Sequence, residues 1–445
     1  MALYFTVPDR RNRSDGPRSV SAQEKMKRRI LFTLGAFFAL LCLLTGRAEL
    51  SYADKEVISS VQIAFAADLH YISPKLTDKG TLFQYVAERN DGKLILYTEE
   101  ILDAFIAQML EERPEVVILA GDLSYNGEFE SHLSLAEKLR RLQAEGIQVL
   151  VLSGNHDVDN PRAYSFHGES YEKARPTTPQ DFSEIYYEFG PAQAISIDPA
   201  SGSYVFQLED MLRILMLDTN SVSKNSLPSE SFSWLEEQLR DAQNQNIHVI
   251  AVSHQNLKIH HPLFIRGYRI TNASSIEKLY RQYKVICQLS GHMHIQHAVA
   301  GTVPEILTSP LCLTPVRYGW LVWNGESFCY DARETDVARF AAEKGETDEN
   351  LLHFPEYARN NLYQIHYNQI VRSYEGSGLE KKTVEKFAAL FADTNYAFFT
   401  GEPIDHAALE EGLRSWKEAD PGFHSSYLES ILEDNGRDPL HYLIR

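Results

Sequence analysis

The chain has 445 residues, 44% of them hydrophobic, and a formal net charge of −18. This length allows more than one domain and a large core. Residues 1–29 carry eight Lys or Arg against three Asp or Glu, so the rest of the chain is more acidic than the total suggests. An acidic body argues against nucleic acid polymers as partners, because binding them depends on Lys and Arg that neutralise phosphates.

Residues 30–45 form an uncharged, mostly apolar run that follows the basic segment. The run is short for a membrane-spanning helix, which needs roughly 20 residues, and its flanks are typical of a secretory signal peptide. The alternative is an uncleaved anchor with its basic end inside, which would attach the chain to a membrane. Either interpretation places the remaining chain outside the cytoplasm, secreted or on the outer face of the cytoplasmic membrane. Translation from Met1 and from Met26 both fit the pattern.

Five largely apolar runs come next, and each ends in a cluster of polar residues. Such runs, rich in Val and Ile, are typical of strands buried on both faces. The runs are residues 61–67, 116–120, 149–152, 249–252 and 285–289. The clusters are Asp68-Leu69-His70, Gly121-Asp122, Gly154-Asn155-His156-Asp157, His254 and Gly291-His292-Met293-His294. Because sites in open α/β sheets form at one end of the strands, we expect the clusters to meet along one rim.

Helices are predicted between these strands, at residues 97–113, 130–144 and 231–243, where apolar residues recur at helical spacing. Alternation of strands and helices indicates an α/β fold. After Gly291 the pattern changes to short strands at residues 295–300, 305–308, 318–323 and 327–330, which we expect to form a second sheet.

From about residue 333 no strand pattern remains, and five segments are predicted to be helical: residues 337–343, 354–372, 381–391, 407–416 and 426–432. This length of chain is that of a small domain. Its expected role is to pack against the rest of the chain and stabilise it. The alternative is a cap over the functional site.

Two long insertions follow the third and fourth polar clusters, at residues 159–202 and 255–271. Loops that leave such a rim commonly carry substrate contacts. His260 and His261 are expected to be exposed histidines before a proline turn. Beyond the apolar run only Cys287, Cys312 and Cys329 remain; they form no disulfide framework and are expected to be small buried hydrophobes.

The five clusters resemble the calcineurin-like metallophosphoesterase family, whose pattern is D-x-H, G-D, G-N-H-[DE], H and G-H-x-H in this order. The resemblance spans residues 57–330. It implies an α/β fold with a two-sheet β-sandwich flanked by helices, here with an α-helical C-terminal extension. The expected domains are a basic N-terminus with signal peptide or anchor (1–53), a metallophosphoesterase domain (56–332) and a helical C-terminal domain (333–445).

The resemblance also implies two metal ions, divalent or trivalent, and assigns their ligands. One ion would be bound by Asp68, His70, Asp122 and His294, and the other by Asp122, Asn155, His254 and His292. Imidazole, carboxylate and amide ligands suit iron, manganese or zinc better than calcium. His292 and His294 are expected on the same side of an extended segment, since they are two residues apart. Glycines before Asp122, Asn155 and His292 would let the backbone approach the ions.

Two further residues are predicted to be catalytic. Resemblance makes His156 a non-ligand that contacts the phosphate and protonates the leaving oxygen. Asp157 is expected to orient that imidazole, with a loop cap as the equal alternative.

The form Gly-Asn-His-Asp resembles most the class III cyclic-nucleotide phosphodiesterases. The predicted function is hydrolysis of small phosphodiesters such as 3′,5′-cyclic nucleotides by a dinuclear metal centre. Aromatic residues of the two insertions would stack a base or hold their own loops: Tyr164, Phe166, Tyr171, Phe264 and Tyr268. The alternatives are an extracytoplasmic phosphomonoesterase, a phospholipid- or sphingomyelin-type phosphodiesterase, and, more remotely, a non-enzymatic binding protein. Substrate, metals and oligomeric state stay open.

Overall fold

The computed structural model describes residues 60–434 and 438–444. The predicted signal peptide or anchor, the apolar run at residues 30–45 and the two candidate start sites lie outside these residues. Within the described part of the chain, no helix is both long enough and apolar enough to cross a membrane.

Two sheets form the centre of the fold. The first has the strand order β15-β14-β13-β1-β2-β3. Its strands are β15 (His441–Ile444), β14 (Phe328–Glu334), β13 (Arg317–Trp323), β1 (Val61–Ala66), β2 (Val116–Ala120) and β3 (Gln148–Leu152). Strands β1, β2 and β3 are parallel, whereas β13 runs antiparallel to β1. The carboxyl ends of β1, β2 and β3 therefore lie at the same edge.

The second sheet has the order β11-β12-β10-β9-β8-β7-β6. Its strands are β11 (His297–Val299), β12 (Glu305–Leu307), β10 (Cys287–Ser290), β9 (His248–Val252), β8 (Leu212–Met216), β7 (Tyr204–Glu209) and β6 (Ser196–Ile197). Strands β8, β9, β10 and β12 are parallel. The ligand-bearing strands are thus divided between two sheets and do not share one.

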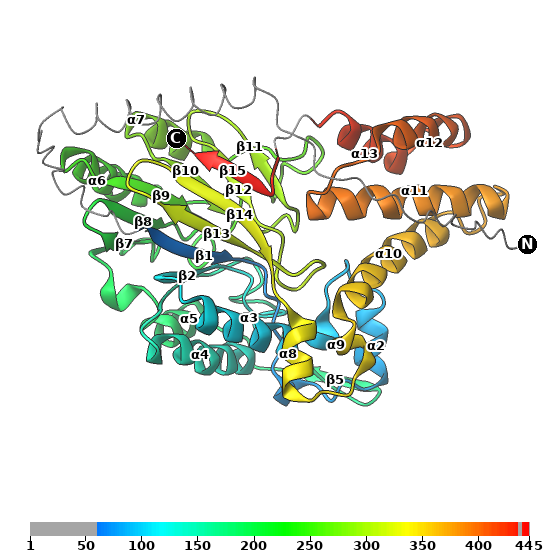
Figure 1. Cartoon of the computed structure of the whole chain (residues 1–445), viewed down its shortest axis with the longest axis horizontal. Helices are drawn as coiled ribbons and strands as arrows, with labels where there is room; N and C mark the ends of the chain where they lie inside the picture. The colour runs from blue at the N-terminus through cyan, green and yellow to red at the C-terminus, as the bar shows by residue number, and fades with distance from the viewer. Residues whose placement is uncertain (1–59, 435–437, 445) are drawn as a thin grey trace, which may run out of the picture. The chain divides into compact units, whose positions relative to one another are not determined.

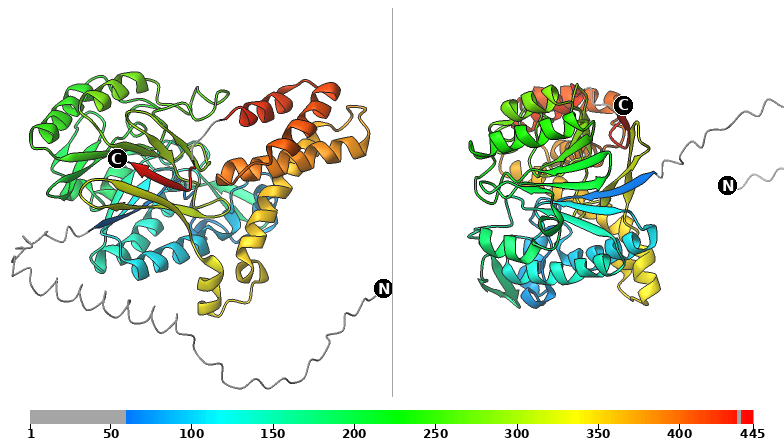
Figure 2. Two further views of the ribbon diagram at one scale, coloured as in Figure 1. Left: turned by 45° about the horizontal axis from the view of Figure 1, so that its top comes forward. Right: turned by 90° about the vertical axis from the view of Figure 1, so that its left-hand side faces the viewer.

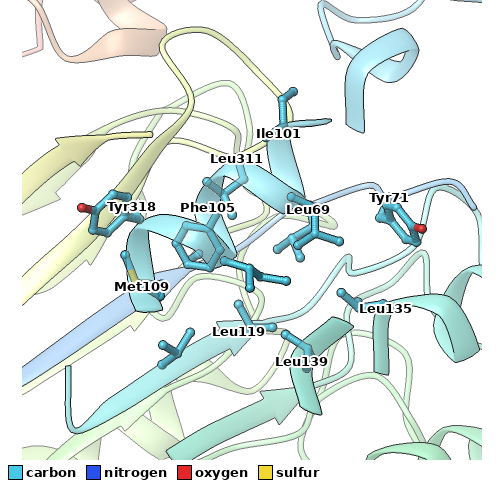
Figure 3. Close-up of a cluster of buried hydrophobic side chains, with 14 of the residues drawn as sticks. Leu69, Tyr71, Ile101, Phe105, Met109, Leu119, Leu135, Leu139, Leu311 and Tyr318 are labelled. Carbon is cyan, nitrogen blue, oxygen red and sulfur yellow. The ribbon is translucent and has the colours of Figure 1, made fainter. Parts of the chain in front are cut away.

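Helices cover the outer face of each sheet (Figures 1 and 2). Apolar side chains fill the layer between each sheet and its helices. The helices are α3 (Thr98–Glu112) and α4 (Phe129–Ala144) on the first sheet, and α6 (Ser231–Asn244) and α7 (Ala273–Gln282) on the second. Helix α3 forms because its apolar residues recur every three or four positions; Ile101, Phe105 and Met109 pack against strand residues such as Leu119 (Figure 3). A third apolar layer lies between the two sheets. The predicted fold class is confirmed.

The strands after Gly291 do not form a sheet of their own, contrary to the prediction. Strands β11 and β12 extend the second sheet, whereas β13 and β14 extend the first. Each pair continues the edge of a sheet that earlier strands had begun, which leaves fewer unpaired edges than a separate sheet would.

The first insertion is structured, although no element was predicted in it. It holds the hairpin of β4 (Tyr164–His167) and β5 (Ser170–Lys173), helix α5 (Pro179–Tyr186) and the short helix η3 (Pro191–Gln193). Helix α5 begins with a capping box between Thr178 and Asp181. Between β1 and β2 lie three further short helices: η1 (Pro74–Leu76), α2 (Thr81–Ala87) and η2 (Ile95–Tyr97).

The C-terminal region is helical as predicted, until its last residues. Its helices are α8 (Val337–Lys344), α9 (Glu349–Leu352), α10 (Phe354–Ser373), α11 (Lys381–Thr400), α12 (His406–Ala419) and α13 (Phe423–Leu432). The expectation that no strand follows residue 333 is wrong, because β14 continues to Glu334 and β15 pairs with it. The chain therefore returns to the first sheet, where Ile444 is buried between the sheets.

Candidate metal centre

The carboxyl ends of five strands bring every predicted metal ligand to one place. Ligand atoms of Asp68, His70, Asp122 and His294 lie within 4.8 Å of one another, and so do those of Asp122, His254 and His292. The Asn155 side-chain oxygen is 3.0 Å from His254 Nε2, so it joins the second group. Asp122 belongs to both groups. The two groups are those that the sequence resemblance assigned to two ions.

The backbone at this rim is strained in a way that few residues tolerate. Asp68, His70, Asp122, His292 and His294 all have positive φ, between 42° and 69°. Non-glycine residues rarely adopt this conformation, which costs of order 1–3 kcal/mol each and collects at functional sites. Residues 291–294 are accordingly bent, and the predicted extended segment is wrong. His292 and His294 nevertheless reach different groups, as expected.

Two glycines at the rim leave room for carboxylates. A Cβ atom on Gly154 would lie 2.2 Å from Asp122 Oδ1, and one on Gly291 would lie 2.5 Å from Asp68 Oδ2. Both distances are far below van der Waals contact. The glycines are therefore needed because the carboxylates pass close to the backbone.

Hydrogen bonds to the backbone fix the orientation of the ligand side chains. His254 Nδ1 donates to the Ala120 carbonyl at 2.9 Å, and His292 Nε2 donates to the Gly267 carbonyl at 3.0 Å. These bonds turn His254 Nε2 and His292 Nδ1 toward the site, where the two atoms lie 3.2 Å apart. Asp68 Oδ2 accepts the amide of His292 at 2.8 Å. Such outer contacts are typical of residues that bind metals.

Burial and charge set the protonation of these groups. Burial lowers the pKa of His70 well below its ordinary value, and burial together with His254 lowers the pKa of His292 to about 4. Burial would also lower the pKa of His254, but the Asp122 carboxylate beside it raises it to about 9. The pKa of Asp122 is lowered despite its burial, because His254 and His156 stabilise the carboxylate. His254 is therefore protonated at neutral pH without a metal ion, and a bound ion would displace its proton, because neutral imidazoles and ionised carboxylates are the forms that ligate metals.

The donor atoms fit two metal ions. His70 Nε2 lies 3.2 Å from His294 Nε2, the same separation as the pair in the second group. Ligand atoms bound at about 2.1 Å to one ion are roughly 3.0–3.4 Å apart, so these separations match. Asp68 Oδ1 is buried, has no hydrogen-bond partner and points to the first group, 3.5 Å from His294 Nε2. A cation would satisfy it.

His156 and Asp157 have different environments, and one predicted role is wrong. His156 Nδ1 donates to the Tyr125 carbonyl at 3.1 Å, which leaves Nε2 facing the site, 3.9 Å from Asp122 Oδ2. Asp157 does not orient this ring. Its buried carboxylate accepts the backbone amides of Leu123, Ser124 and Gly154, so it caps the loops, as the alternative held.

A cavity of about 580 Å³ opens on the metal centre, and the C-terminal helices form much of its wall. Besides site residues, it is lined from α10 by His366 and Gln369, from α11 by Phe391, Asn395, Phe398 and Phe399, and from α13 by Phe423, His424 and Tyr427. These helices also pack on Met293 and Ile295, beside the ligand histidines. The C-terminal region is therefore both a packing element and a cap.

Lys93 and Asp91 also line this cavity, and no sequence signal pointed to them. Lys93 is 7% exposed and binds both oxygens of Asp91, at 2.6 and 2.9 Å. Burial would lower the pKa of Lys93, but Asp91 raises it above its ordinary value. An ion pair of Lys93 and Asp91 thus lies in the wall of the cavity beside the candidate metal centre. Only tertiary contacts bring it there, because Lys93 lies in a loop without a motif.

The insertions differ from expectation in two respects. His260 and His261 are only 5% and 2% exposed, so the prediction of exposed histidines is wrong. Phe264 and Tyr268 line the cavity, whereas the hairpin residues Tyr164, Phe166 and Tyr171 do not, and Phe166 packs on Phe83. All three cysteines of the described residues are free thiols. Cys287 and Cys312 are buried, as expected, whereas Cys329 is exposed, contrary to the expectation.

Comparison with known families agrees with this site. Residues 61–296, more than half of the chain, match the family described as calcineurin-like phosphoesterase. The chain belongs to the calcineurin-like phosphoesterase family. The sequence resemblance is thereby confirmed. Residues 336–438 of this phosphoesterase match the C-terminal domain of cyclic nucleotide phosphodiesterase. No curated protein matches the chain.

Solved structures similar to this phosphoesterase include a dimetal phosphatase from Danio rerio, at 13% identity and a TM-score of 0.47. The alignment covers 62% of this chain and 96% of that one. A purple acid phosphatase from yellow lupin (Lupinus luteus) is 15% identical with a TM-score of 0.36, covering 62% and 52% of the two chains. The family membership and the candidate metal site make the protein a metallophosphoesterase, a metal-dependent hydrolase of phosphoesters.

Proposed function

We propose that this phosphoesterase hydrolyses small phosphodiesters, with 3′,5′-cyclic nucleotides as the substrate class. The observation that carries the proposal is that residues 336–438, which match the C-terminal domain of cyclic nucleotide phosphodiesterase, line the same cavity as the candidate metal ligands. The cavity volume of about 580 Å³ suits a nucleotide-sized ligand.

Two ions are proposed, of iron, manganese or zinc. The first would be held by Asp68, His70, Asp122 and His294, and the second by Asp122, Asn155, His254 and His292. Ions in these places neutralise charge on the phosphate and supply an activated water as nucleophile. The ligand types do not distinguish these three metals, since imidazole and carboxylate bind all of them.

The side chains around the ions would place the substrate and move protons. Lys93 offsets part of the phosphate charge from inside the cavity. His156 is partly exposed, so it can exchange protons with solvent. When doubly protonated, it donates the Nε2 proton to the leaving alkoxide, while its Nδ1 stays bonded to Tyr125. Asp157 takes no direct part, and serves by holding the loop that carries His156.

The diester proposal is tested with a substrate panel. Purified full-length protein should hydrolyse bis-(p-nitrophenyl) phosphate with Mn²⁺ and lose this activity in EDTA. Among natural compounds, cyclic nucleotides should be turned over faster than nucleoside monophosphates, glycerophosphodiesters and sphingomyelin. Activity that survives exhaustive chelation would falsify the metal mechanism. A preference for monoesters would replace the diester assignment, and a preference for sphingomyelin would keep the mechanism and change the substrate.

The aromatic wall of the cavity is expected to hold the base. Phe423 is 63% exposed and stacks near-parallel on Tyr427, with ring centroids 6.4 Å apart. Stacking a base on an aromatic ring contributes about 1–3 kcal/mol, so Phe423→Ala should raise KM for a cyclic nucleotide roughly 5- to 150-fold, with kcat retained. Tyr187→Ala, which removes an exposed ring outside the cavity, is the control. Equal KM values in both variants would contradict a base-binding role.

Location outside the cytoplasm, secreted or membrane-attached, is also proposed, on the basis of the basic and apolar residues 1–45. Fractionation of cells that express the full chain tests this, since recovery in the cytoplasm alone would contradict it.

A further inference from the structure

A second group of histidines lies in a separate cavity of about 430 Å³. It is lined by His260 and His261 from the loop after β9, by His297 from β11, and by Ser430, Glu433 and Asp434 at the end of α13. None of these residues belongs to the candidate metal centre. The cavity therefore lies where the second sheet meets the C-terminal helices.

Two of these imidazoles face each other, each through its Nδ1 atom. His260 Nδ1 and His297 Nδ1 are 2.9 Å apart. On the other side of each ring lies a carboxylate: Asp434 Oδ2 is 2.8 Å from His297 Nε2, and Glu305 Oε2 is 3.2 Å from His260 Nε2. The four side chains form a row, with a carboxylate at each end and two imidazoles in the middle.

The surroundings of Glu305 hold its carboxyl group in place as a hydrogen-bond acceptor. Its side chain is fully buried, and its oxygens accept hydrogen bonds from the amides of Leu257 and Lys258 and the hydroxyl of Ser290. His260 Nε2 faces this carboxylate at 3.2 Å but makes no hydrogen bond to it in the structure.

The second ring, His297, is held from behind by a hydrogen bond from Nε2 to Asp434 Oδ2. The two Nδ1 atoms meet at 2.9 Å, a separation that either a shared proton or a metal ion can bridge. Carboxylates behind both rings increase the attraction for a cation. A carboxylate bonded to the far nitrogen is also the usual outer partner of a histidine that binds a metal.

The candidate metal centre of this chain shows the same local feature. There, two pairs of imidazole nitrogens, His70 with His294 and His254 with His292, face each other at 3.2 Å. A separation of 2.9 Å is close to the roughly 3.0 Å expected for two ligands at a right angle on an ion with bonds of about 2.1 Å. Imidazole is a ligand for zinc, nickel and copper rather than for magnesium or calcium.

We propose that His260 and His297 bind a third metal ion, a divalent transition metal of the zinc type, through their Nδ1 atoms. Glu305 and Asp434 are its outer partners, and the open cavity leaves the other positions to water. The ion would join the loop after β9 to the end of α13. Because that loop and that helix also line the catalytic cavity, the third ion would hold the cap in place without taking part in hydrolysis.

Counting metals in a background without the catalytic pair tests the proposal. The Asp122→Ala chain, dialysed against Zn²⁺ and then against metal-free buffer, should retain one ion per chain by elemental analysis. Adding His297→Gln or His260→Gln to Asp122→Ala should remove that ion, whereas adding His353→Gln, an exposed histidine of the C-terminal region, should not. In the otherwise wild-type chain, His297→Gln should bind two ions instead of three and keep its activity on bis-(p-nitrophenyl) phosphate.

A milder variant covers the case in which the histidine variants do not fold. Asp434→Asn keeps the shape of the side chain and removes its charge, so it should weaken Zn²⁺ binding at this site about 10- to 100-fold. Its affinity is measured by competition with a chromogenic chelator. The proposal is overturned if wild type and His297→Gln bind equal numbers of Zn²⁺, Co²⁺ and Ni²⁺ ions, since a shared proton would then occupy the space between the rings.

Discussion

Replacing Asp122 by alanine should empty both catalytic metal positions at once. Its Oδ1 lies 3.3 Å from His254 Nε2 in one group, and its Oδ2 lies 3.7 Å from His70 Nε2 in the other. No other candidate ligand of the described residues belongs to both groups. Loss of an outer partner alone costs a metal site about 10- to 100-fold in affinity or activity, so loss of a shared ligand should cost more than about 100-fold in kcat/KM.

The measurement is metal content by elemental analysis, together with turnover of bis-(p-nitrophenyl) phosphate. Asp122→Asn is the test of folding, because it keeps the side chain's shape and removes the charge. Asp331→Ala, which changes an exposed carboxylate on β14, should leave both metals and turnover unchanged. A variant that retains one fully occupied catalytic position would show that Asp122 is a ligand of a single ion.

His156→Gln should have the opposite pattern, with both metals retained and turnover lost. The ring is held by Tyr125 and Asn126 through Nδ1 and belongs to neither ligand group. A positioned general acid contributes typically 10²- to 10⁴-fold, so kcat should fall by about that factor. KM should change little, because Lys93 and the ions remain to bind the phosphate.

The leaving group separates acid catalysis from a general disturbance of the site. p-Nitrophenolate leaves without help, whereas the ribose alkoxide of a cyclic nucleotide needs a proton. His156→Gln should therefore reduce turnover of the cyclic nucleotide much more than that of bis-(p-nitrophenyl) phosphate. An equal loss with both substrates contradicts the role of proton donor, and a loss of metal makes His156 a ligand.

Misassigned residues show where sequence reasoning reaches its limit. The proline after His260 and His261 predicts an exposed turn, but the end of α13 covers them, and Ser430 contacts His261 Nε2 at 3.0 Å. The adjacency of Asp157 and His156 predicts a contact between their side chains, yet the two side chains have different partners. Both errors come from using neighbours in sequence as if they were neighbours in space.

The sequence by itself determined the five strands that precede the ligands and most of the longer helices, and its resemblance to the family supplied the ligand set. Apolar runs of four to seven residues fix β1, β2, β3, β9 and β10 locally, and parallel strands must end at one edge, so motifs that follow them converge. The sequence also predicts the role of Gly154 and Gly291, because each precedes a metal ligand at a point where the backbone must pass close to the site.

Only the tertiary structure decided how these elements meet. It divided the strands after Gly291 between two sheets, brought β15 back to β14, placed Lys93 beside the metal centre and closed the cavity with α10, α11 and α13. The physical reason is that periodicity records which face of an element is buried but not which distant element covers it. That choice depends on the fit of side chains from segments far apart in the chain, as at the contact of α11 and α13 with Met293.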